Sequence, residues 1–160
     1  MLFKNRKYNQ LILKAKESFK NDDLKESAKY YEKAFSIKVN LSDLIMYGYI
    51  LIDLQEYRKS EEVFNNISED FDFTEINFAL ANIYERTNRK QQAIERYEKV
   101  LVNNPDFEQA HFSLAYIYDD ISEEEGKSFE DEIVKKAMYH YQEALKLNNN
   151  NFLNVINYFL

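Results

Sequence analysis

The sequence predicts an all-α solenoid, a fold in which short helix pairs stack one after another. One observation is composition, because two glycines and one proline in 160 residues are too few for a loop-rich β protein or a disordered chain. The other is an internal repeat of a small residue, an aromatic residue four positions later and a small or aliphatic residue three further on. The aromatic positions 31, 64, 97 and 141 are 33, 33 and 44 residues apart, a period typical of solenoids. The four occurrences are Ser27, Tyr31, Ala34; Ser60, Phe64, Ile67; Ala93, Tyr97, Val100; and Ala137, Tyr141, Ala144.

Composition and charge exclude several kinds of function. The formal net charge of −7 argues against a nucleic-acid partner, which requires a basic face. The absence of cysteine excludes disulfides, thiol catalysis and Cys-type zinc sites, and agrees with a reducing compartment. The N-terminus lacks the apolar segment of a signal peptide, and the most apolar stretch, residues 44–54, is too short to span a bilayer. We therefore expect a soluble cytoplasmic protein without membrane insertion.

The first three helix pairs follow from apolar spacing and turn residues. The expected helices are 4–20 and 24–37, 42–54 and 58–67, and 75–87 and 90–102. Asn21, Asp22 and Asp23 form a turn and an N-terminal signal for the second helix, because an Asp or Asn side chain accepts the first amide hydrogens of a helix. Thr74 is expected to cap the third pair.

The fourth pair is expected to begin at Pro105, since the first helical turn tolerates a missing donor. It is longer than the others by about ten residues, which lie between Tyr118 and Ala137. Gly126 has the character of a glycine just after a helix, and Ser128 with Asp131 resembles a capping box. We expect both helices to extend by about a turn and a half and to meet at Gly126. Phe129, Ile133 and Val134 would continue the apolar stripe.

Residues 152–160 are apolar around most of a helical circumference, although terminal repeats normally present a polar outer face. The segment either docks on the last repeat, binds another chain, or begins a further repeat. Its candidate residues for self-association are Phe152, Val155, Ile156 and Phe159. The predicted organisation is one domain, 1–160, with repeats at 8–40, 41–73, 74–107 and 108–151, followed by a terminal helix or the start of a further repeat at 152–160.

The third unit carries the fullest pattern, with Asn77, Leu80, Ala81 and Tyr84, then Ala93 and Tyr97, then Pro105. This order of large, small and aromatic positions resembles the tetratricopeptide repeat, a 34-residue helix–turn–helix unit. The other three units match in Ala15, Ser27, Tyr31 and Ala34; in Tyr47, Gly48, Ser60 and Phe64; and in Leu114, Ala115, Tyr118, Ala137, Tyr141 and Ala144. The resemblance covers residues 8–151 and implies a right-handed α-α superhelix of four repeats plus a short C-terminal helix.

In the family, the first helix of each pair lines a concave groove that usually binds peptides. Some members hold a C-terminal carboxylate there with lysine, asparagine and arginine side chains. At the matching positions this chain has Ile12, Lys16, Met46, Glu75 and Ala79, so no such clamp is predicted. The resemblance instead implies a largely apolar and aromatic groove, for which the candidates are Lys16, Ile45, Met46, Tyr49, Phe78, Asn82, Arg86, Phe112 and Tyr116. Register places Ile12 and Ile52 in the groove as well. The alternative is that some of these residues pack between repeats and never face the groove, because a one-residue register error turns a helix by about 100°.

Motifs for catalysis and for metal or cofactor binding are missing. His111 takes a packing position, His140 is expected at a helix surface, and no HExxH motif or phosphate-binding glycine loop occurs. An acidic cluster lacks the ligand order of a calcium loop and is expected to be a solvated helix end; it comprises Asp119, Asp120, Glu123, Glu124 and Glu125. We predict a scaffold that is not an enzyme, needs no cofactor or metal, and binds an unidentified protein or peptide in its groove. The alternatives are a self-assembly module, which forms a homo-oligomer through the apolar tail, or an accessory domain of a larger protein or complex.

Overall fold

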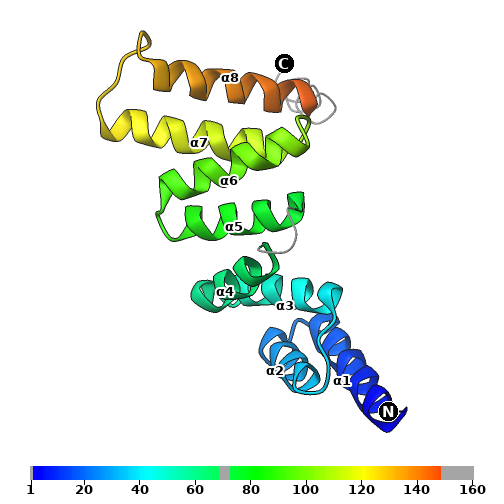
Figure 1. Cartoon of the computed structure of the whole chain (residues 1–160). Coiled ribbons are helices and arrows are strands. Elements are labelled where there is room, and N and C mark those ends of the chain that lie inside the picture. The colour runs from blue at the N-terminus through cyan, green and yellow to red at the C-terminus, as the bar shows by residue number, and fades with distance from the viewer. Residues whose placement is uncertain (1, 69–72, 149–160) are drawn as a thin grey trace, which may run out of the picture. The chain divides into compact units, whose positions relative to one another are not determined.

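The computed structural model describes residues 2–68 and 73–148, with side chains from residue 3, and the regular structure within these ranges is entirely α-helical (Figure 1). The helices are α1 (Leu2–Lys20), α2 (Leu24–Phe35), α3 (Leu41–Asp53), α4 (Tyr57–Ser68), α5 (Thr74–Arg86), α6 (Lys90–Asn103), α7 (Glu108–Glu124) and α8 (Glu132–Leu147). They form two compact units, residues 1–71 with α1–α4 and residues 72–160 with α5–α8. Each unit contains two of the predicted helix pairs. The predicted all-α architecture of paired helices is therefore confirmed.

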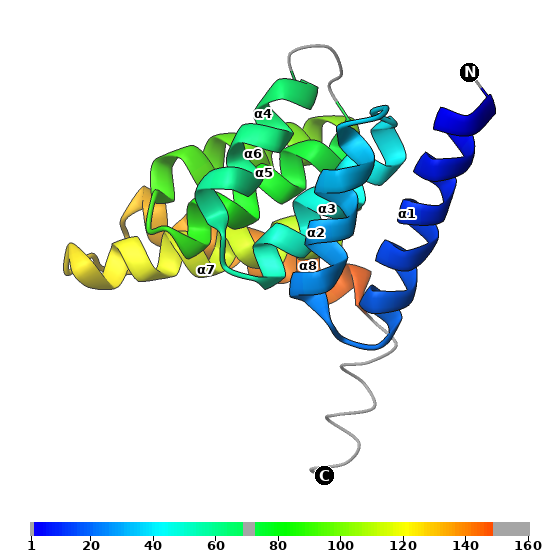
Figure 2. The same cartoon turned by 90° about the horizontal axis from the view of Figure 1, so that it is seen from below.

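Helices of one pair run antiparallel across a tight turn, as α1 and α2 show in Figures 1 and 2. Small residues make the close approach within each pair. The Ser27 hydroxyl donates to the Ala15 carbonyl at 2.8 Å, and the Ser60 hydroxyl donates to the Gly48 carbonyl at the same distance. A larger side chain at these positions would push the two helices apart. The repeated small residues in the sequence are thus the contact points of the pairs.

The repeated aromatic residue occupies the centre of each pair. Tyr31, Phe64 and Tyr97 are fully buried, whereas Tyr141, in the last pair, is only half-buried. Each ring contacts its neighbours in the same unit; Tyr31, for example, lies 6.4 Å from the Tyr47 ring between centroids. Burying aromatic rings at this position supplies much of the hydrophobic stabilisation of each pair.

The same helix-ending motif closes the first helix of all four pairs. In each, one residue adopts a left-handed conformation: Asp22, Gln55, Asn88 and Gly126 have φ angles of 61°, 60°, 57° and 63°. The amide of the following residue then donates to a carbonyl five positions back, as from Asp23 to Ser18 and from Lys127 to Ser122. This is the Schellman arrangement, which satisfies carbonyls at a helix end. Gly126 therefore ends α7 as predicted.

Several predicted helix starts differ from the structure. Asp23 does cap α2, since its side chain accepts from the Glu26 amide at 3.1 Å. Thr74, however, is the first residue of α5, and the capping position is taken by Phe73 without a side-chain hydrogen bond. Pro105 is also not in a first helical turn, because α7 begins at Glu108. These turns close through backbone hydrogen bonds, such as that from the Ala110 amide to the Phe107 carbonyl at 3.1 Å.

The extra residues of the fourth pair form a loop as well as longer helices. α7 has 17 residues against 13 in α5, while α8 does not begin until Glu132. Ser128 is not a helix cap; its amide donates to the Asp131 carboxylate at 2.7 Å, and Asp131 precedes α8. Phe129 is 82% exposed, so it does not continue the apolar stripe. The predicted terminal segment 152–160 lies outside the described residues.

Candidate functional site

The first helices of the second unit, α5 and α7, place the predicted groove residues at equivalent positions. On α7, Phe112 and Tyr116 are one turn apart and 57% and 55% exposed. On α5, Phe78 is half-buried, because its ring packs 5.8 Å from that of Tyr97 and 4.9 Å from that of Phe107. We call Phe78, Asn82, Arg86, Phe112 and Tyr116 the α5/α7 face. Its α7 half is open aromatic surface, and its α5 half is partly packed between helices.

The core aromatic residues support this face from below. Tyr97 of α6 contacts Phe78, and its buried hydroxyl donates to the Glu85 carboxylate at 2.6 Å. Tyr141 of α8 lies 6.2 Å from Phe112 in an edge-on arrangement. Because Phe112 rests on the Tyr141 ring, the orientation of Phe112 is constrained before any partner binds.

Polar groups on α5 add hydrogen-bonding capacity beside the rings. Arg86 is exposed, and its Nε donates to the Asn82 side-chain oxygen at 2.8 Å. Asn82 itself is half-buried. An amide and a guanidinium side by side can bind peptide carbonyls or a carboxylate.

The acidic cluster on α7 is partly neutralised by α6. Lys90 lies 2.7 Å from the Asp120 carboxylate and 2.6 Å from that of Glu124. These acids hold the pKa of Lys90 above its usual value, mainly through the hydrogen bonds that they accept from the ammonium group. No group of three or more potential metal ligands occurs in the described ranges. The expectation of a solvated helix end therefore omitted an interhelical ion pair.

In the first unit the predicted groove residues are less open. Ile45 and Tyr49 of α3 are half-buried, with the Tyr49 ring 5.4 Å from that of Phe64, and Met46 is 38% exposed. Lys16 of α1 is exposed and lies 3.4 Å from Asp43, which also accepts a 2.6 Å hydrogen bond from Tyr8. This network, in which Tyr8 and Asp43 are buried, joins α1 to α3 and positions the exposed Lys16.

Two residues assigned to the groove by register belong to the core instead. Ile12 of α1 and Ile52 of α3 are only 8% and 7% exposed. Ile12 packs in the cluster that also contains Tyr8 and Ala15. The neighbouring helix covers the side of α1 that carries Ile12. Register alone therefore assigned to the groove a side of the helix that belongs to the core.

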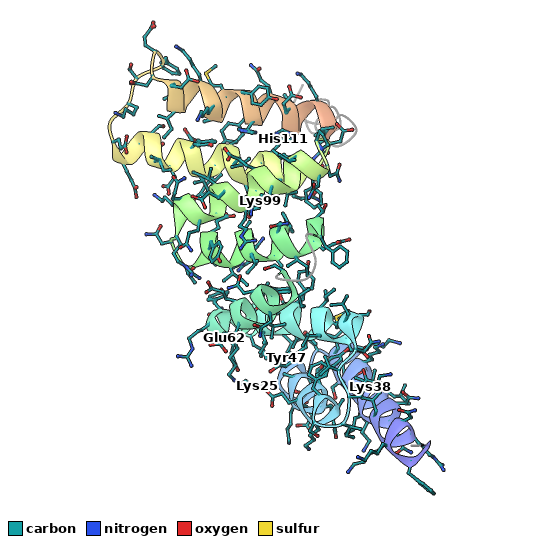
Figure 3. The ribbon with its side chains drawn as sticks, in the orientation of Figure 1. Lys25, Lys38, Tyr47, Glu62, Lys99 and His111 are labelled. Atoms are coloured by element: carbon teal, nitrogen blue, oxygen red, sulfur yellow. The ribbon has the colours of Figure 1, made fainter. Side chains whose placement is uncertain are left out.

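A pair of histidines joins α7 to α8, and Figure 3 shows His111 at this position. His111 is buried, as predicted, but His140 is half-buried in the same contact and not at the surface. Their Nδ1 atoms are 2.9 Å apart, and His111 Nε2 lies 3.0 Å from the Pro105 carbonyl oxygen. A carbonyl only accepts, so His111 donates from Nε2, and in the neutral pair His140 donates from Nδ1 to His111.

Burial lowers the pKa of His140 to about 4, with further contributions from His111 and Lys136, while Glu143 acts in the opposite direction. The rings of Tyr118 and Tyr139 enclose the rest of the imidazole, at centroid distances of 5.9 and 5.0 Å. The unfolded chain, whose histidine pKa is near 6.5, therefore takes up this proton first as the pH falls.

We expect the free energy of unfolding of the second unit to fall as the pH is lowered from about 6.5 to about 4. Allowing for solvent screening at a half-buried site, the loss due to His140 is about 1.5 kcal/mol. A His140→Gln variant keeps a donor toward His111 but does not titrate, so its stability should vary less over this range. Urea denaturation at closely spaced pH values measures the difference, and parallel curves for the two proteins would show that His140 has no such role.

Sequence reasoning missed the histidine pair, the Lys90 ion pairs and the tyrosine–acid hydrogen bonds. Tyr118, for example, donates to Glu98 at 3.2 Å, and burial raises its pKa to about 12. These contacts join residues 12 or more positions apart, so only the pairing of helices reveals them. No helix in the described part of the chain is long and apolar enough to span a membrane.

Comparison with known proteins agrees with this architecture. Residues 74–107, which contain α5 and α6, match the family described as tetratricopeptide repeat. Residues 74–107 therefore form a tetratricopeptide repeat. The family is a group of scaffolds that are generally non-catalytic and typically mediate protein or peptide binding.

Solved structures share the tetratricopeptide fold at low sequence identity. A structure of MamA matches with a TM-score of 0.75 and 16% identity over 91% of this chain and 75% of that one. MamA from Desulfovibrio magneticus RS-1 (residues 41 to the end) gives 0.76 and 14% over 89% and 76%. YrrB, described as a TPR protein with an unusual peptide-binding site, gives 0.71 and 16% over 91% and 71%. No curated protein matches the sequence, so these comparisons show the fold alone.

Proposed function

We propose that this chain is a non-catalytic scaffold that binds a protein or peptide through the α5/α7 face. The observation that carries the proposal is the exposure of Phe112 and Tyr116, 57% and 55%, on a helix whose other apolar side chains are buried or half-buried. Adjacent exposed aromatic rings are costly in water and typical of contact sites. The tetratricopeptide architecture supports the proposal, because it typically mediates such binding.

The chemistry of the face favours a ligand with an apolar anchor and polar groups beside it. Phe112 and Tyr116 offer exposed aromatic surface, and the Phe112 ring rests on that of Tyr141. Asn82 and Arg86 offer donors for the backbone or a carboxylate of the ligand. A short amphipathic helix or an extended segment with one large apolar side chain meets both requirements.

The first unit contributes a second, smaller candidate surface. Met46 is exposed beside half-buried Ile45 and Tyr49, and a flexible thioether adapts to different ligands. Lys16, held by Asp43, is the cation of this surface. We expect no clamp for a C-terminal carboxylate, since a single lysine, Lys16, stands where the clamp needs several donors.

Capture from a lysate of the source organism tests the proposal. A Phe112→Ala/Tyr116→Ala variant should lose the captured partner, with an affinity at least about tenfold weaker than that of the wild type. The matched control is Val102→Ala/Phe129→Ala, which removes two apolar side chains that are 80% and 82% exposed in the same unit. The control should retain binding, and equal retention by both variants would place the binding site elsewhere.

A further inference from the structure

One side of α8 carries opposite charges at equal distances on either side of Tyr139. Glu132 and Lys146 each lie seven positions from Tyr139, in opposite directions along the chain, and Lys135 and Glu143 each lie four positions from it. Steps of four and seven residues return to the same side of a helix, so the five side chains form a single row along α8. We call Glu132, Lys135, Tyr139, Glu143 and Lys146 the α8 row.

Most of the α8 row is exposed. Tyr139 is 54% exposed, and of the four charged residues only Glu143 is half-buried. Glu143 pairs with Lys146 of the same helix. Glu132 and Lys135, in contrast, form no ion pair within residues 2–68 and 73–148, although residues three positions apart on a helix can do so. Two opposite charges of the row are therefore available to a partner.

Apolar surface lies beside the α8 row. Met138 and Leu145, two turns apart, are 47% and 42% exposed. The residues that match Met138 in the repeat are Ile94 of α6 and Ala28 of α2, which are 5% and 7% exposed in helices that pack against α7 and α3. No helix of the described ranges follows α8. The last pair therefore presents apolar side chains on a flank that is buried in other pairs.

We propose that α8 pairs with α8 of a second copy of this chain, antiparallel and about a two-fold axis at Tyr139. In this arrangement Glu132 lies opposite Lys146 of the second copy, Lys135 lies opposite Glu143, and the two Tyr139 rings meet on the axis. Each charge pair occurs twice, as the symmetry of an isologous interface requires. The charges thus specify both the direction and the register of the pairing.

The other second helices lack this self-complementary pattern. The position that matches Tyr139 is Lys29 in α2, Glu62 in α4 and Glu95 in α6. Pairing any of these helices with its own copy in the same register would place two like charges on the axis, which is strongly unfavourable. The pattern that allows pairing is therefore specific to α8 and is not a general property of the repeat.

The interface is small, since each copy contributes one helix. Exposed ion pairs add little affinity but disfavour other registers, so the attraction comes mainly from Met138, Tyr139 and Leu145. We expect a dimer that forms at micromolar concentration and dissociates on dilution. Such a dimer carries two α5/α7 faces and would bind a partner with two sites more tightly. This consequence rests on the proposed function, whereas the dimer itself does not.

A cysteine on the two-fold axis tests the geometry. The chain has no cysteine, so Tyr139→Cys introduces a single thiol, and two such thiols are adjacent in the proposed dimer. With diamide at micromolar protein concentration, the disulfide-linked dimer should form at least about tenfold faster than in Phe129→Cys. Phe129 is 82% exposed in the same unit but lies off the axis. Equal rates for the two variants would overturn the proposal.

Charge reversal tests the register and leaves Tyr139 in place. Glu132→Lys puts two lysines opposite each other at both ends of the interface, so sedimentation equilibrium should give a dissociation constant at least about tenfold higher than that of the wild type. Glu132→Lys/Lys146→Glu exchanges the charges and should restore the constant to within about threefold. The control is Glu123→Lys, which changes the net charge equally at an exposed position of α7 and should leave the dimer intact.

Circular dichroism checks that each variant is folded. A wild type that stays monomeric throughout the micromolar range would overturn the proposal, as would a double variant no more dimeric than Glu132→Lys alone. A dimer that neither charge variant affects would show that a different surface joins the copies. None of these measurements involves a bound partner, so their outcome is independent of the proposal for the α5/α7 face.

Discussion

Replacing Tyr97 with alanine is expected to lower the free energy of unfolding of the second unit by about 4 kcal/mol. Tyr97 is fully buried between α5 and α7, contacts Phe78 and donates to Glu85 at 2.6 Å. Its removal leaves a cavity below the α5/α7 face, and the helices on both sides are too well packed to fill it. Urea denaturation followed by circular dichroism measures the loss.

Tyr97→Phe is the matched control for this cavity. It removes only the hydroxyl, so the expected loss is about 1 kcal/mol. The first unit already has phenylalanine, Phe64, at the corresponding position, and that ring is also fully buried. If alanine cost no more than phenylalanine at position 97, the repeated aromatic residue would not be the centre of the pair.

A Gly48→Ala substitution is expected to destabilise the first unit by about 2 kcal/mol. A Cβ atom at this position would lie 2.6 Å from Cζ of Phe64, inside van der Waals contact. Phe64 is fully buried and cannot swing away, so the clash outweighs the roughly 1 kcal/mol that alanine gains over glycine in a helix. Urea denaturation of the single variant gives the value.

A second substitution checks the physical cause of that loss. Phe64→Leu removes the ring atoms that meet the new methyl group, so the double variant Gly48→Ala/Phe64→Leu should be more stable than the sum of the two single effects implies. Additive losses would mean that the glycine is needed for a reason other than its contact with Phe64.

The sequence predicts the parts of this fold that repeat. Where two helices of a pair touch, the residues must be small, as Gly48 and Ser60 are. At the centre of each pair the residue must be large, as Tyr97 is, so both kinds of residue recur at a fixed period. Helix starts are harder to predict, because α5 and α7 begin after Phe73 and Phe107 with no side-chain cap. Backbone hydrogen bonds close those turns and leave little trace in the residue types.

The candidate site was only partly predictable. Register assigned Phe112 and Tyr116 to the groove, and both are exposed, but it also assigned Ile12 and Ile52, which neighbouring helices bury. Adjacent positions on a helix point about 100° apart, so the boundary between groove and core depends on how closely the next helix packs. The His111–His140 contact joins two positions, 29 residues apart, that no local pattern connects.

Proteins with low sequence identity can share this fold, so the residues that build the scaffold are distinct from the residues that select a partner. MamA and YrrB share the fold at 14–16% identity. Small and aromatic packing positions maintain the helix pairs, while exposed positions such as Phe112, Tyr116 and Arg86 are free to differ between proteins. The fold therefore indicates the class of function, whereas the side chains on the exposed face decide which ligand binds.

The most direct test of the central claim is to map the binding surface on the chain itself. A peptide from the captured partner, titrated into isotope-labelled protein, should shift the amide and side-chain NMR resonances of Phe112, Tyr116, Asn82 and Arg86. Resonances of Val102 and Phe129, exposed in the same unit but away from this face, should stay in place. Shifts at those two residues without shifts at Phe112 and Tyr116 would contradict the proposal that the α5/α7 face binds the partner.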